Sequence, residues 1–300
     1  MLLNNKTGLF NEARKAKYLP NLIVAILLGI GFFIVGQFLG VGVSILISLS
    51  KINFTNVSAF VTQLIIMFSL ISVCVFFWVK FIEKRKISTL GFYKRNAFKN
   101  YMRGFFIGLI LFSIVTFILL VTGNAILDKN FHGKVGVAAI GSVLLVLPAW
   151  VVQSATEEIL TRGWLMNIIG ARYSAGLGLI VSSMLFSLAH FFNPNVNMIA
   201  LMNIVLVGLL FGLYVIKYKE LWGACGIHAS WNWAQGNIYG FEVSGNQVDT
   251  GTLFKLESVG SNWITGGSFG PEAGIVSTLI LMVGIYVLLR LIKKEAQKPI

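Results

Sequence analysis

Residues 22–47 read LIVAILLGIGFFIVGQFLGVGVSILI, a run without any charged side chain. A helix of about 20 apolar residues crosses the ~30 Å hydrocarbon core of a bilayer, because its backbone groups are all hydrogen-bonded within the helix. The run is long enough for this purpose. It therefore predicts a transmembrane helix as the first long element of the chain.

Seven more apolar segments follow this run. They span residues 59–79, 104–121, 137–156, 175–192, 196–216, 221–233 and 273–289. Over the whole chain 56% of the residues are hydrophobic and 12% are charged, whereas soluble domains carry about a quarter of their residues as charges. We expect an all-α, polytopic protein of the cell membrane with about eight transmembrane helices, its direct surroundings being the lipid bilayer.

The positions of the basic residues predict the orientation. All but four of the 24 Lys and Arg residues lie in alternate connecting segments that include both chain ends; the exceptions are Lys51, Lys129, Lys134 and Lys255. Such a bias is typical of cytoplasmic segments, so both termini are expected in the cytoplasm. The net charge of +13 then reflects topology. Nucleic acid is not expected as a partner, because no basic patch with interleaved aromatic residues is present.

The chain is expected to form one membrane domain. We predict a cytoplasmic tail at residues 1–20, a transmembrane helical domain at 21–292 and a second cytoplasmic tail at 293–300. A straight helix over residues 137–172 would be ~54 Å long at 1.5 Å per residue. A bend or break is therefore expected, with Pro148 as the candidate.

A few polar side chains interrupt the late apolar segments. These are Glu157, Glu158 and Arg162 at the end of the fourth, His190 near the end of the fifth, and His228 and Asn232 in the seventh. Ionisable groups within spans are costly, face the protein interior and are functional candidates. A lone His or Asn in a span often only bonds across helices, but three separate spans contribute to this set.

The spacing of these residues indicates how they pair. Glu158 and Arg162, four residues apart, can form an ion pair on one helix face. Glu157 points about 100° away, and a helix hairpin brings it to a similar depth as His190. A carboxylate opposite an imidazole can bind and deprotonate water, as hydrolysis at a carbonyl group requires.

His228 and Asn232 are also four residues apart and can donate hydrogen bonds to a developing oxyanion. Two other functions remain open. The Glu and His residues would also suit a proton relay in a transporter, although no internal repeat supports one. A membrane protein that binds a peptide without cleaving it is the other alternative.

At these positions the sequence resembles the CPBP intramembrane protease family, which includes CAAX prenyl endopeptidases and bacteriocin-processing or immunity proteins. Three motifs carry the resemblance: EExxxR at Glu157, Glu158 and Arg162, FxxxH at Phe186 and His190, and HxxxN at His228 and Asn232. The LGF stretch at Leu90–Phe92 and the GGSFGPE stretch at Gly266–Glu272 are also similar to bacterial members. Thr161 departs from the pattern, because an aromatic residue commonly precedes the arginine.

The resemblance implies an intramembrane endopeptidase that cleaves a membrane peptide or a lipidated protein, of CAAX, pheromone or bacteriocin type. It implies that Glu157 and His190 activate water and that His228 and Asn232 stabilise the oxyanion. Glu158, Arg162 and Phe186 would support the site. A non-catalytic immunity or regulatory protein is the alternative that the same resemblance allows.

The cofactor requirement stays open at this point. Members of the family have also been described as metallopeptidases, and Glu157, His190 and His228 match a zinc ligand set. No HExxH pairing is present in the sequence. We therefore expect a metal-free mechanism that requires no cofactor, with zinc as the other possibility.

Overall fold

The computed structural model describes residues 3–50 and 52–297 and is mostly helical. Each predicted apolar segment corresponds to a helix: α2 (Leu22–Leu49), α3 (Asn56–Phe77), α4 (Ala97–Val121), α5 (Ile140–Glu158), α7 (Ala175–Ala189), α8 (Met198–Tyr218), α9 (Trp222–Trp233) and α11 (Ile275–Ala296). Within the described ranges, 6 helical stretches are long and apolar enough to cross a membrane, whereas α7 and α9 are shorter. The all-α polytopic membrane fold is confirmed, and the count of eight crossings stays a prediction.

The remaining elements are short. They are α1 (Gly8–Arg14), α6 (Met166–Arg172), α10 (Asn262–Thr265) and the antiparallel strands β1 (Ala125–Leu127) and β2 (Leu256–Ser258). Helix α1 lies in the predicted N-terminal tail, but it packs on α6 and buries Leu9 and Phe10. The tail is thus folded onto the membrane domain. The described residues do not include residue 51 or the outermost parts of both predicted tails (1–2 and 298–300). The basic residues Lys51 and Lys298, which were used to predict the orientation, lie there.

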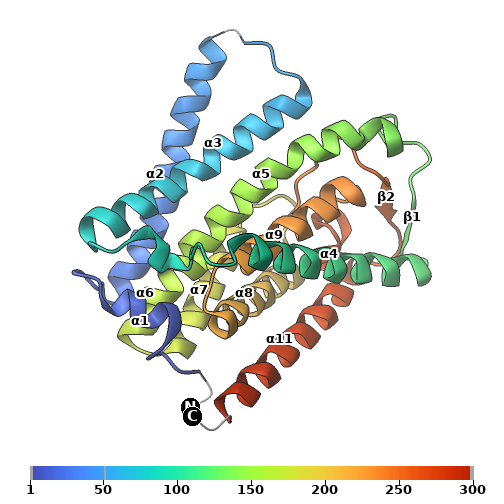
Figure 1. Ribbon diagram of the computed structural model, residues 1–300. Helices are drawn as coiled ribbons and strands as arrows, with labels where there is room; N and C mark the ends of the chain where they lie inside the picture. Colours follow the sequence, from blue (N-terminus) through green and yellow to red (C-terminus); the bar gives the residue numbers. More distant parts are fainter. Residues whose placement is uncertain (1–2, 51, 298–300) are drawn as a thin grey trace.

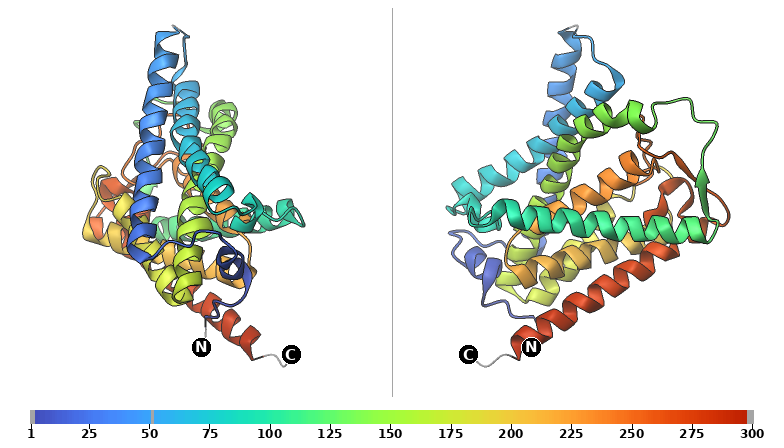
Figure 2. Two further views of the ribbon diagram at one scale, coloured as in Figure 1. Left: turned by 90° about the vertical axis from the view of Figure 1, so that its left-hand side faces the viewer. Right: turned by 45° about the vertical axis from the view of Figure 1, so that its right-hand side comes forward.

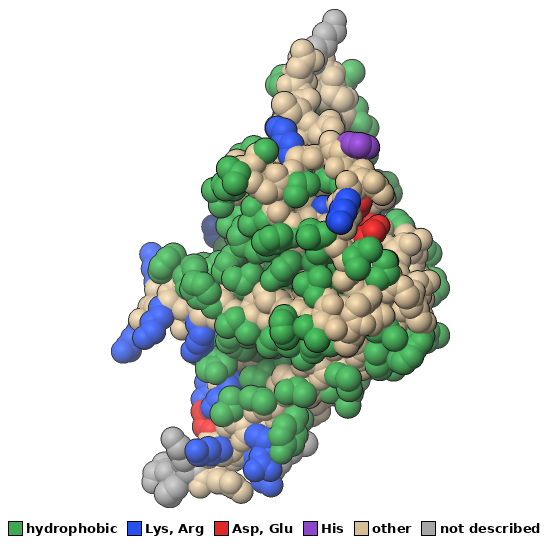
Figure 3. Space-filling model, turned by 90° about the vertical axis from the view of Figure 1, so that its right-hand side faces the viewer, with side chains coloured by type: hydrophobic (Ala, Val, Ile, Leu, Met, Phe, Trp, Pro, Cys, Tyr) green, Lys and Arg blue, Asp and Glu red, His purple; other side chains and the backbone are tan. Residues whose placement is uncertain are grey.

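The helices form a bundle from which α2 and α3 project as a hairpin (Figures 1 and 2). Helix α3 packs on both α2 and α5, α4 lies along α9, and α8 packs on both α7 and α11. Helix α1 and the C-terminal end of α11 lie at the same end of the molecule (Figure 1). Hydrophobic side chains cover the middle of the face in Figure 3, with Lys and Arg concentrated towards its lower end.

Glycines set the distance between α4 and α9. A Cβ atom at Gly104 would lie 1.9 Å from the carbonyl oxygen of Gly223, and one at Gly108 would lie 2.2 Å from that of Ile227. Small residues allow such close approach of helix backbones in membranes. Because α9 carries His228 and Asn232, this contact helps to fix where two of the predicted site residues lie.

The long segment from Gly136 to Arg172 continues without a break. Pro148 lies inside α5, so the helix does not break there, and a bend at this residue stays a prediction. The irregularity lies further on, where the backbone forms a π-helix at Ile159–Leu165 directly after α5. π-Helical turns within longer helices are frequent at functional sites, and this one begins next to the paired glutamates.

Candidate active site

The end of α5 holds a buried ion pair. Arg162 Nη1 donates to Glu158 Oε1 at 2.8 Å, and both side chains are fully buried. The pair predicted from the spacing is confirmed. The guanidinium carbon of Arg162 also lies 4.2 Å from the centroid of the Phe186 ring, which is within cation–π distance. Phe186 therefore contacts the ion pair directly.

His228 lies between the two glutamates. Its Nδ1 is 3.0 Å from Glu158 Oε1, and its Nε2 is 3.5 Å from Glu157 Oε2. An ionised carboxylate only accepts hydrogen bonds, so we assign the Nδ1 proton to the bond with Glu158. Glu157 Oε2 is buried and forms no hydrogen bond to any described residue. Glu158 Oε2 likewise has no such bond, but of the two carboxylates it is that of Glu157 that lines a large cavity, where it can accept from a water molecule.

His190 follows the last residue of α7, and its ring is oriented by the backbone. Its Nδ1 lies 2.8 Å from the carbonyl oxygen of Phe186. A carbonyl oxygen only accepts, so Nδ1 donates, and in the neutral ring Nε2 keeps its lone pair. Nε2 of His190, on the side of the ring away from the last turn of α7, is therefore free to accept a hydrogen bond.

Asn232 is held by a residue that the motifs do not include. Its Nδ2 donates to Gln153 Oε1 at 2.9 Å, and both side chains are buried. An amide nitrogen has two hydrogens, so the second remains for another acceptor. Gln153 lies four residues before Glu157, one helical turn away, and this spacing is the sequence signal that could have identified it.

Three of the predicted residues meet at one cavity. Glu157, His190 and Asn232 line a space of about 500 Å³. Its remaining walls come from α2, α3, α5, the end of α7 with Asn193 beyond it, and the loop at residues 243–248. The helices that carry these three residues are α5, α7 and α9 or their ends, so the packing of three separate segments creates the cavity.

A second cavity, of about 30 Å³, adjoins the first and shares His190 and Asn232 with it. His228 and Glu272 also line it, and the space is sufficient for a water molecule. Glu272 Oε1 accepts a hydrogen bond from the backbone N–H of Ser244. No motif assigned Glu272 a role, although it ends the GGSFGPE stretch.

Buried contacts hold the π-helical segment on the side away from the cavity. The side-chain amide of Asn167 donates to the carbonyl oxygens of both Arg162 and Gly163. Trp164 Nε1 donates to Glu83 Oε1 at 2.6 Å. A Cβ atom on Gly163 would lie 3.3 Å from the carbonyl oxygen of Leu90. The LGF stretch therefore packs against this turn.

The described side chains do not form the zinc ligand set that the sequence left open. Within residues 3–50 and 52–297, no three His, Cys, Asp or Glu side chains are placed to hold one metal ion. His228 directs its two nitrogens to two different carboxylates. Glu157, His190 and His228 thus do not converge on a single point.

Residues 139–234 match the model of a family described as type II CAAX prenyl endopeptidase Rce1-like. The predicted family resemblance is confirmed. The Rce1-like segment covers about a third of the chain and contains all three motifs. No curated protein and no solved structure matches the chain. Together with the long apolar helices, the match indicates a multi-pass membrane protein with a segment similar to that of a CAAX-type protease family.

Proposed function

We propose that this protein is an intramembrane endopeptidase in which Glu157 and His190 activate a water molecule. The observation that carries the proposal is that Glu157, His190 and Asn232 line one cavity within the Rce1-like segment. The substrate is a membrane-associated peptide or protein, because the cavity lies among the helices of a multi-pass membrane protein.

The two acceptors identified above suit one water molecule. It donates one O–H group to the carboxylate of Glu157 and the other to Nε2 of His190, so its lone pairs face the substrate carbonyl. The C–O bond forms as Glu157 takes the proton. When the C–N bond breaks, Glu157 returns this proton to the leaving amine nitrogen. General base catalysis of this kind contributes about 10²–10⁴-fold to the rate.

The oxyanion of the intermediate is stabilised by donors on α9. Asn232 supplies the amide hydrogen that is not bonded to Gln153. His228 donates from Nε2 when its ring is protonated, since Nδ1 is already bonded to Glu158. The Glu158–Arg162 pair holds this ring in place, and Phe186 packs against the pair. No step of this scheme uses a metal ion.

The test is cleavage of a library of membrane peptides by the purified, reconstituted protein. The library contains prenylated CAAX-type, pheromone-like and bacteriocin-like peptides. The wild type is compared with Glu157→Gln and His190→Ala, each with and without a chelator. The matched controls are Glu257→Gln and His132→Ala, which alter exposed residues outside the cavity.

The expected result is cleavage by the wild type and by both controls, and none by the two site variants. Loss of cleavage with a chelator would contradict the metal-free mechanism. If no folded form of the protein cleaves any peptide, a binding measurement with the same library tests the non-catalytic alternative.

A further inference from the structure

The molecule has two faces of different charge. The basic face contains the N-terminal segment, the loop after α3, the turn after α6 and the ends of α8 and α11. Several contacts join these segments: Arg14 Nε donates to the carbonyl oxygen of Ala171, and Lys217 pairs with Glu295. Most Lys and Arg residues of the chain belong to this face, as the sequence pattern predicted.

The loop face lies at the other end of the helices. It contains the strand pair β1–β2, which joins the segments around residues 122–136 and 239–262 (Figure 1). Among the described residues of these segments, the basic ones are Lys129, Lys134 and Lys255. By the bias that marks cytoplasmic segments, the loop face is the non-cytoplasmic one.

The mouth of the large cavity belongs to the loop face. Gln63, Asn246 and Gln247 line it and are exposed. Gln63 lies on the N-terminal part of α3, and the other two lie in the loop at residues 243–248. This part of α3 packs on the same loop, because Phe60 and Val243 belong to one apolar cluster. The entrance is thus formed by segments that start or lie on the loop face.

The cavity is closed towards the basic face. Four fully buried side chains lie between the glutamate pair and the basic face: those of Arg162, Trp164, Leu90 and Leu221. Among the lining residues on α5, Glu157 lies furthest towards the basic face, because α5 starts at the loop face. None of the residues that line it comes from the basic loops. A substrate on the basic face would therefore have to cross a packed layer.

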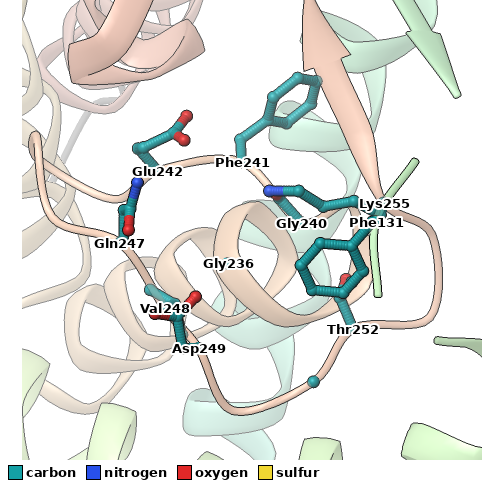
Figure 4. A pocket seen from close by; sticks show the side chains of 11 residues that line it. Phe131, Gly236, Gly240, Phe241, Glu242, Gln247, Val248, Asp249, Thr252 and Lys255 are labelled. Atoms are coloured by element: carbon teal, nitrogen blue, oxygen red, sulfur yellow. The ribbon is translucent and has the colours of Figure 1, made fainter. Parts of the chain in front are cut away.

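The loop at residues 243–248 is a thin wall. Its outer side lines a separate pocket of about 230 Å³ (Figure 4), and Gln247 and Val248 contribute to both this pocket and the large cavity. The outer pocket also contains Glu242, Asp249 and Lys255. A single segment of chain therefore separates the large cavity from the outer pocket.

The lining of the large cavity selects the type of substrate. Besides Glu157 and His190, the lining residues carry no ionisable group, and neither Lys nor Arg is among them. Side-chain amides line it instead, at Gln37, Gln63, Gln153, Asn193, Asn232, Asn246 and Gln247. Amides pair with the N–H and C=O groups of an extended peptide. The strongest partners of a terminal carboxylate are Arg and Lys, and neither lines this cavity.

We propose that the substrate enters from the loop face, on the non-cytoplasmic side, as an uncharged internal stretch of a membrane peptide. The proposal rests on the proposed endopeptidase function and narrows its substrate class. A free C-terminal carboxylate held close to the scissile bond, as in a CAAX peptide on the cytoplasmic side, does not fit this cavity.

The side of entry is tested by cysteine labelling, which requires no activity. Both native cysteines are first replaced (Cys74→Ala, Cys225→Ala). Single cysteines are then introduced at the mouth of the cavity (Gln63→Cys or Gln247→Cys), on the loop face (Lys129→Cys) and on the basic face (Lys94→Cys). Intact cells are treated with a membrane-impermeant maleimide. We expect the mouth positions and Lys129→Cys to be labelled, and Lys94→Cys only after permeabilisation. Mouth positions that react only after permeabilisation would overturn the proposal.

The substrate class is tested with a peptide that the wild type cleaves in detergent, supplied with a free or an amidated C-terminus. We expect the same kcat/KM for both. If the cavity bound the terminal carboxylate, amidation would remove a charged hydrogen bond and lower kcat/KM by about tenfold or more. Such a decrease would overturn the proposal. Absence of cleavage in detergent would instead count against the endopeptidase function, so the two failures are distinguishable.

Discussion

Helices α2 and α9 differ in both composition and burial: α2 projects from the bundle with α3, whereas α9 lies inside it. In α2 the most apolar window has a mean hydropathy of 2.6, and only 22% of that window is buried. Helix α9 carries His228 and Asn232 and is buried along almost its whole length. In a bilayer, apolar side chains face a solvent that is itself apolar. High hydropathy alone therefore does not predict which helices of this protein are buried.

The strongest test of this contrast is the change Glu157→Gln in the interior. The amide cannot take a proton from water, so we expect cleavage to fall by about 10²–10⁴-fold with little change in fold. The measurement is kcat with a peptide that the wild type cleaves, and circular dichroism checks the fold. Activity within a few-fold of the Glu257→Gln control would exclude Glu157 as the base.

A second test removes one partner of the buried ion pair. Arg162→Leu leaves Glu158 buried without a cation, which costs about 3–5 kcal/mol of stability. Lys15→Leu removes the exposed partner of Glu12, and such pairs are worth about 0–1 kcal/mol. Unfolding in mixed micelles measures both. Equal stability of the two variants would mean that the interior does not depend on this pair.

A third test compares glycines on the two kinds of helix. Gly104→Ala places a Cβ atom 1.9 Å from the carbonyl oxygen of Gly223, and such overpacking costs about 1–3 kcal/mol. At Gly42 on α2, no described atom lies within 4 Å of a new Cβ atom. There the alanine should stabilise the helix by about 0.5–1 kcal/mol. Unfolding in mixed micelles measures the stability of both variants. If both substitutions stabilised the protein, or both destabilised it, the proposed difference between α4–α9 packing and α2 would be wrong.

The smallest expected effect concerns the starts of the two helices. Glu220 Oε2 accepts from the backbone N–H of Gly223 at the start of α9, whereas the neutral Asn21 caps α2. Burial raises the pKa of the Glu220 carboxyl above its ordinary value of 4.5, more than the hydrogen bond from Gly223 and the charge of Arg103 lower it.

The folded state therefore keeps the Glu220 proton to a higher pH than the unfolded chain does. The resulting stability is complete below the unfolded pKa and is lost as the pH rises through the folded pKa. Above pH 4.5, the stability of the wild type should fall with pH more steeply than that of Glu220→Gln. Asn21→Ser should keep the slope of the wild type. Parallel curves for wild type and Glu220→Gln would show that this carboxyl does not contribute.

Much of the site could be predicted because its residues recur at helical spacings within otherwise apolar segments. Glu158 and Arg162 face each other one turn apart, and this local relation does not depend on the rest of the fold. Gln153 and Glu272 were missed for the opposite reason. Gln153 matters through its bond to Asn232 on α9, and Glu272 through its place beside a cavity that α7 and α9 form with a distant loop.

The sequence by itself determined that this chain is a helical membrane protein and that three of its segments carry polar side chains at helical spacings. Apolar length and residue spacing are properties of single helices, so they can be derived without the fold. Only the tertiary structure decided that the long segment stays continuous through Pro148, that α4 and α9 touch at glycines, and that the cavity opens at the loop face. These features arise from packing between segments far apart in the chain, where a single atom such as a Cβ on Gly104 determines how closely two helices approach.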